Sequence, residues 1–436
     1  MPLQSASRRT QIPVSRMPTL SSATDARADH TAAAFTASYS AVFGLLLACC
    51  HAERQAEDGS VWDFLGSLIP YISDWKRVFE LAEHHGVLPA IHRVLCVAGQ
   101  ERFVGLLPVE VRDELERRSA YLAKKNLRLA AELIRILDCL DAAGVVAIPH
   151  KGPVLAETVY GDLAGRDFSD LDVLVQARDI PYAKEALARI GYKPNISLST
   201  AEERAYVASG YEYTFDGSAG KNLLEIQWSF VPRFFAVDFD MEGVFARARS
   251  GSVAGRTVRM LSPEDLFLSM CVHSAKHLWA RLCWLRDIAA TVERQPLDWS
   301  RVRSESRRLG VERIVAVSLA LAGTLLGAKI PESWGVAGTG QSDAQVAAMT
   351  AEIARHIPNA EEYSTESVDY FRWMLRLRER SQDRWRFASR LLFTPGLGEW
   401  AWVKLPQSLF PLYRGVRLFR VGGRLLGLRS RVDSLQ

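Results

Sequence analysis

The chain has 436 residues, a formal net charge of +4 and six cysteines. Such a length suffices for two or three domains with buried cores, and the shares of 48% hydrophobic and 24% charged residues exclude a disordered or fibrous chain. The cysteines form no Cys-x-x-Cys pair and show no metal-ligand spacing. This pattern excludes a zinc module of that type and indicates reduced core residues of a cytoplasmic protein.

Residues 1–33 are expected to be a disordered leader, because they are rich in Ser, Thr, Ala, Arg and Pro and lack apolar periodicity. The apolar stretch at 43–50 lies too deep in the chain for a signal peptide and is too short to span a membrane. No transmembrane segment is expected elsewhere. Residues 34–144 show helical spacing, with stop signals at Gly86 and Gly144.

After Gly144 the spacing of apolar residues changes from a helical to a strand-like pattern. A strand is expected at 145–149, followed by a turn at 151–153 and a helix at 153–160. A second strand at 168–175 and a helix at 180–190 come next. Two further strands, at 211–215 and 223–228, are expected to be joined by a hairpin turn at 216–218. A capping box at Ser262 begins a helix expected to run to Glu293. Residues 294–436 are expected to be helical. The succession predicts an α+β core at 145–293 between helical N- and C-terminal regions.

Positive charge is concentrated at the C-terminal end. Between Phe371 and Gln436 there are fourteen Lys or Arg against four Asp or Glu, so the rest of the chain carries a net charge of −6. A basic end of this kind suits phosphate-rich ligands or a membrane surface. Amphipathic helices with an arginine-rich solvent face explain it equally well, and both interpretations stay open.

The most informative motif is Asp170-Leu-Asp172, which continues into Val-Leu-Val. In a strand, residues two apart point to the same face. The two carboxylates therefore project together and repel each other unless a cation lies between them. Hard oxygen ligands suit Mg²⁺ (or Mn²⁺) and the phosphates that it carries. Phosphoryl or nucleotidyl transfer is therefore the first hypothesis.

Nucleotidyl transfer needs further groups, and the chain offers a candidate for each. Lys151-Gly152 at a helix start offers backbone N–H groups and a positive charge to phosphates. Glu225, on a later strand, offers a third carboxylate as metal ligand or general base. The remaining cations that could bind phosphate are Arg166 and Lys276.

Plainer interpretations exist for several of these residues. Glu225 alone could be a solvated strand residue. Arg166 could instead pair with Asp167 or Asp170, and Asp287 fits a structural partner of an arginine. The aromatic residues around the capped helix are expected to be packing residues: His273, His277, Trp228, Trp279 and Trp284.

The order strand, Lys-Gly turn, helix, Arg-x-x-x-Asp-x-Asp strand and acid on a later strand resembles the polymerase-β-like nucleotidyltransferase superfamily. More narrowly, the chain resembles the bacterial uncharacterised nucleotidyltransferase family over about 40–420. Further segments that carry the resemblance are Trp75 with 82–87, 224–228, 273–279, 284–287 and 393–417. Two departures are Glu225, where the family commonly has Asp, and Gln227, where it usually has His.

The resemblance implies an Mg²⁺-dependent enzyme that transfers an NMP from an NTP, expected to be ATP, to an unidentified small-molecule, peptide or protein acceptor. Asp170, Asp172 and Glu225 would then be both metal ligands and catalytic residues. The alternative is a catalytically silent protein of the same fold, which binds nucleotide or a partner protein in a biosynthetic system, since Gln227 removes a titratable group. A nucleic-acid substrate is not expected, because the basic C-terminal end lacks a helix-hairpin-helix signature.

Overall fold

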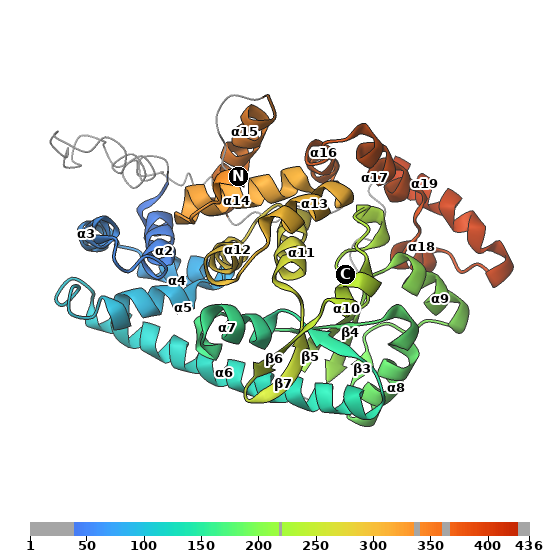
Figure 1. The fold of residues 1–436 in the computed structure, drawn as a ribbon, viewed down its shortest axis with the longest axis horizontal. Coiled ribbons are helices and arrows are strands. Elements are labelled where there is room, and N and C mark those ends of the chain that lie inside the picture. The colour runs from blue at the N-terminus through green and yellow to red at the C-terminus, as the bar shows by residue number, and fades with distance from the viewer. Residues whose placement is uncertain (1–38, 218–219, 335–340, 360–366, 426–436) are drawn as a thin grey trace, which may run out of the picture.

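The computed structural model describes residues 39–217, 220–334, 341–359 and 367–425 (Figure 1). The fold is α+β, as the sequence predicts: a small mixed sheet lies between helical regions formed by both ends of the described chain. The leader expected at 1–33 lies outside the described residues. Within them, no helix is both long enough and apolar enough to cross a lipid bilayer.

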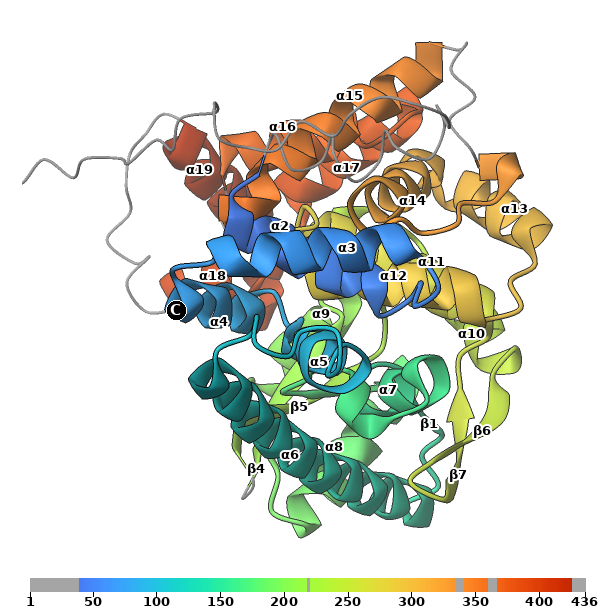
Figure 2. The same cartoon turned by 90° about the vertical axis from the view of Figure 1, so that its left-hand side faces the viewer.

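Helices precede the sheet. They are α2 (Ala41–Ala52), α3 (Gly59–Leu68), α4 (Trp75–His84), α5 (Leu88–His92), a π-helical turn η3 (Arg93–Ala98) and the long α6 (Val109–Ala142). Figure 2 shows α2 to α5 between α6 and the C-terminal helices. A buried ion pair joins the end of α2 to a helix far along the chain. In this pair the guanidinium of Arg286 donates to the carboxylate of Glu53 at 2.7 Å. These N-terminal helices therefore share their core with the rest of the molecule.

The sheet has the strand order β1-β2-β5-β4-β3. Its strands are β1 (Ala147–Pro149), β2 (Leu171–Val175), β3 (Lys193–Pro194), β4 (Glu212–Gly217) and β5 (Gly220–Gln227). The pair β2–β5 is parallel, and the other pairs are antiparallel. A separate hairpin consists of β6 (Arg249–Val253) and β7 (Arg256–Met260). The helices within this part are α7 (Gly152–Tyr160), α8 (Ile180–Arg189), α9 (Thr200–Ser209) and α10 (Met241–Ala246).

One face of the sheet is apolar and packs on α6 and α8. Val173 of β2 and Ile226 of β5 are buried there with Leu133 of α6. Figure 1 shows α6 running along this side, with the next two helices, α11 (Pro263–Lys276) and α12 (Leu282–Arg294), on the opposite side. Because side chains alternate along a strand, the neighbouring residues Asp172 and Glu225 belong to the opposite face. The hydrophobic pattern thus decides which way the carboxylates point.

The remaining helices form the C-terminal region. They are α13 (Trp299–Leu309), α14 (Glu312–Leu326), α15 (Gln341–His356), α16 (Val368–Arg376), α17 (Ser381–Phe393), α18 (Leu397–Trp402) and α19 (Tyr413–Leu425). Helix α14 packs on α12 and α11, and α19 packs on α17.

Two expected elements differ most from the structure. The single helix expected from Ser262 to Glu293 is divided into α11 and α12, because Leu278 and Trp279 adopt positive φ angles of 49° and 51°. Trp279 is fully buried there, and its indole N–H donates to the Ser318 hydroxyl at 3.0 Å. The strand expected at 168–175 begins only at Leu171, so Asp170 lies directly before the strand.

Candidate active site

Asp172 and Glu225 lie side by side on adjacent parallel strands. They are direct partners in the β2–β5 register, so their side chains share one face of the sheet. Asp172 is almost fully buried, and Glu225 is partly buried. Asp170 precedes β2 by one residue and completes the group of three carboxylates that the sequence predicts.

The three carboxylates repel one another, and their burial disfavours the ionised forms. Burial raises the pKa of Glu225 to about 9, with further contributions from the charges of Asp172 and Glu212. Burial and the charge of Asp172 also raise the pKa of Asp170. Burial raises the pKa of Asp172, but attraction to Lys151 and the hydrogen bonds that the carboxylate accepts outweigh this effect, so its pKa is lowered overall and Asp172 stays ionised. The site therefore favours an additional positive charge.

Lys151 and Gly152 lie beside these carboxylates, as the sequence predicts. The Lys151 ammonium is 3.2 Å from Asp172 Oδ1. Although burial lowers the pKa of Lys151, the charges of Asp172, Glu225 and Asp170 raise it overall. Gly152 begins α7 with a φ of +49°, and a Cβ at this position would lie 3.2 Å from the Asp170 carbonyl oxygen. A glycine is needed here because the backbone is left-handed and also passes close to the backbone of Asp170.

Gln227, which the sequence indicates only as a departure from the family, lies at the centre of the site. Its Nε2 donates to Asp172 Oδ1 at 2.8 Å and to Glu225 Oε2 at 2.9 Å. Its Oε1 lies 3.0 Å from His150 Nε2, and burial lowers the pKa of His150 to about 4. His150 therefore acts as a neutral donor that fixes the orientation of the Gln227 amide.

Glu212 also belongs to this face, because it is opposite Gln227 in the β4–β5 register. Sequence reasoning missed Glu212 and His150. The signal that could have found Glu212 is its place in a strand that pairs with the strand of Glu225.

Lys276 lies near the carboxylates but binds a tyrosine. Its ammonium donates to Tyr211 Oη at 3.0 Å. Burial lowers the pKa of Lys276, an effect that attraction to Glu212 opposes. Lys276 therefore lies at the edge of the site, with its ammonium held by Tyr211. His273 and His277 pack against Trp284 with ring centroids 5.3 and 5.1 Å apart, in agreement with their expected packing role.

Arg166 does not join the carboxylate group. Its Nε and Nη2 donate to both carboxylate oxygens of Asp287, which also accepts a bond from Tyr160 Oη at 2.7 Å. The partner of Asp167 is instead Lys125, at 2.6 Å. The predicted structural role of Asp287 as the partner of an arginine is thus confirmed. Asp287 holds the guanidinium of Arg166, and phosphate binding by Arg166 stays a prediction.

Among the described residues, no three His, Cys, Asp or Glu side chains form a ready-made metal site. Gln227 and Lys151 both donate to Asp172 Oδ1. The donor set itself nevertheless fits Mg²⁺, since three carboxylates and a raised carboxyl pKa mark a place where a divalent cation would relieve repulsion. These residues are thus chemically suited to the cation.

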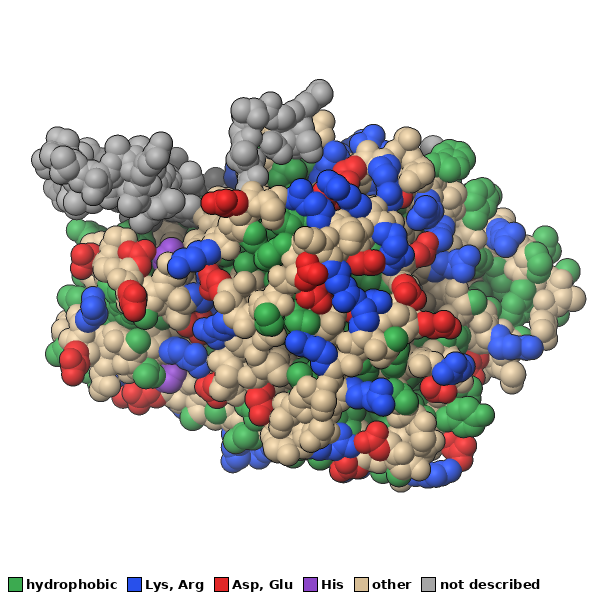
Figure 3. All heavy atoms as spheres, in the orientation of Figure 1, with side chains coloured by type: hydrophobic (Ala, Val, Ile, Leu, Met, Phe, Trp, Pro, Cys, Tyr) green, Lys and Arg blue, Asp and Glu red, His purple; other side chains and the backbone are tan. Residues whose placement is uncertain are grey.

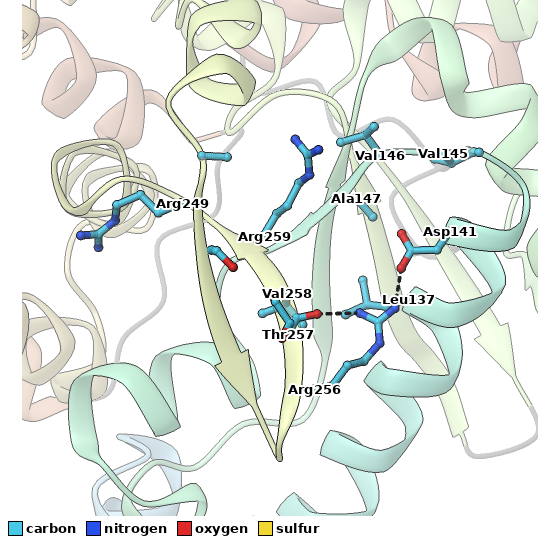
Figure 4. A pocket seen from close by; sticks show the side chains of 13 residues that line it. Leu137, Asp141, Val145, Val146, Ala147, Arg249, Arg256, Thr257, Val258 and Arg259 are labelled. Carbon is cyan, nitrogen blue, oxygen red and sulfur yellow. Dashed lines mark hydrogen bonds and ion pairs between the residues drawn. The ribbon is translucent and has the colours of Figure 1, made fainter.

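A pocket of about 590 Å³ lies elsewhere, between β1, the end of α6 and the β6–β7 hairpin (Figure 4). None of the carboxylates described above lines it. Arg256 closes one side by binding Asp138 at 2.8 Å and also Asp141. Figure 4 shows Arg259 extending into the space between the hairpin and β1. This pocket is separate from the candidate active site.

A small mixed sheet with carboxylates on adjacent strands, next to a Lys-Gly helix start, is the arrangement expected of a nucleotidyltransferase. The family model described as "Uncharacterised nucleotidyltransferase" matches residues 72–327, and the chain belongs to this family. The match covers more than half of the chain and includes α4 to α6 before the sheet and α13 and α14 after it. No curated protein and no solved structure shows a significant match. Family membership indicates a transferase that acts on a nucleotide in general.

Proposed function

We propose that the protein is an Mg²⁺-dependent enzyme that transfers an NMP from an NTP, with ATP as the expected donor, to an acceptor of unknown identity. The observation that carries the proposal is the register of Asp172 with Glu225, next to Asp170 and Lys151. The acceptor could be a small molecule, a peptide or a protein.

Each residue has a defined role in this proposal. Asp170, Asp172 and Glu225 would hold the cation, with Glu225 as third ligand or as the base that takes the proton of the acceptor hydroxyl. Bound Mg²⁺ would offset the negative charge of the triphosphate. Lys151 and the N-terminus of α7 would bind phosphate oxygens, and Lys276 is a further cation for the leaving pyrophosphate.

The chemistry is an in-line displacement. The acceptor oxygen forms a bond to the α-phosphorus, and the bond from this phosphorus to the oxygen bridging to the β-phosphate breaks. Pyrophosphate leaves with the electron pair of that bond, while the acceptor proton goes to Glu225 or to solvent. The protein contributes mainly position and charge, since little covalent chemistry is required of it.

A second candidate is a protein of this fold without turnover that binds nucleotide as an accessory to a biosynthetic system. The observation that favours it is the occupation of Asp172 Oδ1 by Gln227 and Lys151, which must rearrange before a cation can bind there.

One assay separates the two candidates. Pyrophosphate release is measured with each of the four NTPs, Mg²⁺ and pools of small-molecule and peptide acceptors, together with nucleotide affinity. The variants are Asp170→Asn and Asp172→Asn, with Asp179→Asn beyond β2 as the matched control. The enzyme proposal expects release that only the first two variants abolish. Mg²⁺-dependent binding without release favours the accessory role, and the absence of any nucleotide binding contradicts both.

A further inference from the structure

Helix α19 packs with two arginines toward the protein. Arg417 and Arg420 bind the carboxylate of Glu399 on α18, at 3.3 and 2.6 Å. Glu399 is almost fully buried, and the two arginine side chains are only 15% and 12% exposed. The inward face of this helix therefore combines these charged groups with the buried side chains of Tyr413 and Val421.

The outward face of α19 carries large apolar side chains. Phe419 is 72% exposed and Leu418 is 40% exposed. The ring of Phe419 stacks on Trp402 of α18, with centroids 5.9 Å apart and planes at 14°. The preceding 3-10 helix, η9 (Gln407–Leu412), adds Leu409 and Leu412, which are also exposed. We call Trp402, Leu409, Leu412, Leu418 and Phe419 the C-terminal apolar surface.

Helix α19 departs from the usual pattern of a surface helix. A surface helix ordinarily buries its apolar stripe and turns its charges to water. Tyr413 and Val421 are buried as expected, but Arg417 and Arg420 also pack inward on Glu399, while Leu418 and Phe419 face outward. Large exposed apolar side chains that gather in one region mark a site of contact with a partner. The stack of Phe419 on Trp402 holds this surface in one arrangement.

The charge around the surface indicates the nature of the partner. Residues 371–436 hold fourteen Lys or Arg against four Asp or Glu, although some of these arginines, Arg376, Arg390, Arg417 and Arg420 among them, pair with carboxylates of the protein. Arg414, next to the apolar residues on α19, is exposed and forms no ion pair within the described part of the chain. Figure 3 shows hydrophobic side chains at the end of the molecule where α19 lies, with Lys and Arg side chains around them. Exposed Trp, Phe and Leu with flanking arginines are the composition of helices that lie in the surface of an anionic lipid bilayer.

We propose that the C-terminal apolar surface docks on an anionic lipid bilayer, with Phe419 and Trp402 entering the interface and arginines contacting lipid phosphates. This contact does not depend on the nucleotidyl-transfer chemistry, because it lies on other elements than the sheet. It would hold the protein at a membrane surface.

The test is sedimentation of the full-length protein with vesicles of phosphatidylcholine alone or with about 30 mol% phosphatidylserine. We expect binding to the anionic vesicles, weakened more than about tenfold by the double change Trp402→Ser/Phe419→Ser. Arg414→Glu, which leaves the apolar residues intact, is expected to weaken binding only to the anionic vesicles. Tyr71→Ser is the matched control, because Tyr71 is 71% exposed but lies on the N-terminal helices; it should change nothing.

Three results would overturn the proposal. The first is no binding to anionic vesicles, and the second is equal loss of binding in the Tyr71→Ser control. The third is a dimer in solution that the Trp402→Ser/Phe419→Ser change dissociates, since a second copy of the chain would then be the partner of this surface.

Discussion

Replacement of Gly152 by alanine tests whether the start of α7 must lie close to the backbone of Asp170. Gly152 has a φ of +49°, and the new Cβ would lie 3.2 Å from the Asp170 carbonyl oxygen. Gly161, at the other end of the same helix, has a φ of +73° and no atom within 4 Å of an added Cβ. A comparison of Gly152→Ala with Gly161→Ala therefore separates the cost of backbone strain from the effect of the contact with Asp170.

The expected magnitudes follow from this comparison. A left-handed alanine costs about 1–2 kcal/mol, part of which the lower entropy of the unfolded chain offsets. Gly161→Ala should thus lose about 1 kcal/mol in the free energy of unfolding and leave nucleotide affinity unchanged. Gly152→Ala should lose at least as much stability and should also lower nucleotide affinity about tenfold or more, because α7 must move away from Asp170.

Urea denaturation gives the free energy of unfolding, and equilibrium binding of ATP in the presence of Mg²⁺ gives the affinity. Equal nucleotide affinities of the two alanine variants would refute the reasoning, since the contact with Asp170 would then have no bearing on the site.

Three further predictions concern charges. Asp287→Asn should lower the free energy of unfolding by about 3–5 kcal/mol because it leaves the buried Arg166 unpaired, whereas Asp369→Asn at the exposed pair with Arg372 should cost less than about 0.5 kcal/mol in the same urea titration. Above the pH range in which the histidines of the unfolded chain titrate, metal-free wild type should lose stability as the pH rises from about 7 toward 9, by up to about 1.4 kcal/mol per pH unit through Glu225, since folded Glu225 keeps its proton up to about pH 9 while the unfolded chain releases it near its ordinary pKa; Glu225→Gln should remove this contribution to the slope, and an unchanged slope would contradict the assignment. Mg²⁺ at about a hundred times its Kd should stabilise wild type by about 2.7 kcal/mol in a thermal melt, and an equal gain in Asp172→Asn would place the cation elsewhere.

The sequence predicts the parts of the site that depend on local patterns. The alternation of β2 and β5 and the Lys151-Gly152 helix start predict which carboxylates share a face. The family match over 72–327 agrees with the resemblance seen in these motifs. Local rules suffice here because the residues that form each element also determine where its side chains point.

The sequence does not reveal the partners that come from distant segments. Arg166 lies 121 positions from Asp287, and no local pattern links the two residues. The break between α11 and α12 was equally hidden, because buried apolar residues continue through Leu278 and Trp279. The amide of Gln227 reaches two carboxylates and His150 only once three strands are aligned.

The most direct test of the carboxylate site is the binding of Mn²⁺, which substitutes for Mg²⁺ and is followed by electron paramagnetic resonance in the presence of ATP. We expect bound Mn²⁺ in wild type and in Asp179→Asn, and a loss of at least about a hundredfold in affinity in Asp170→Asn and Asp172→Asn. Undiminished Mn²⁺ binding in those two variants would show that the aspartates do not hold the cation and would contradict the proposed function.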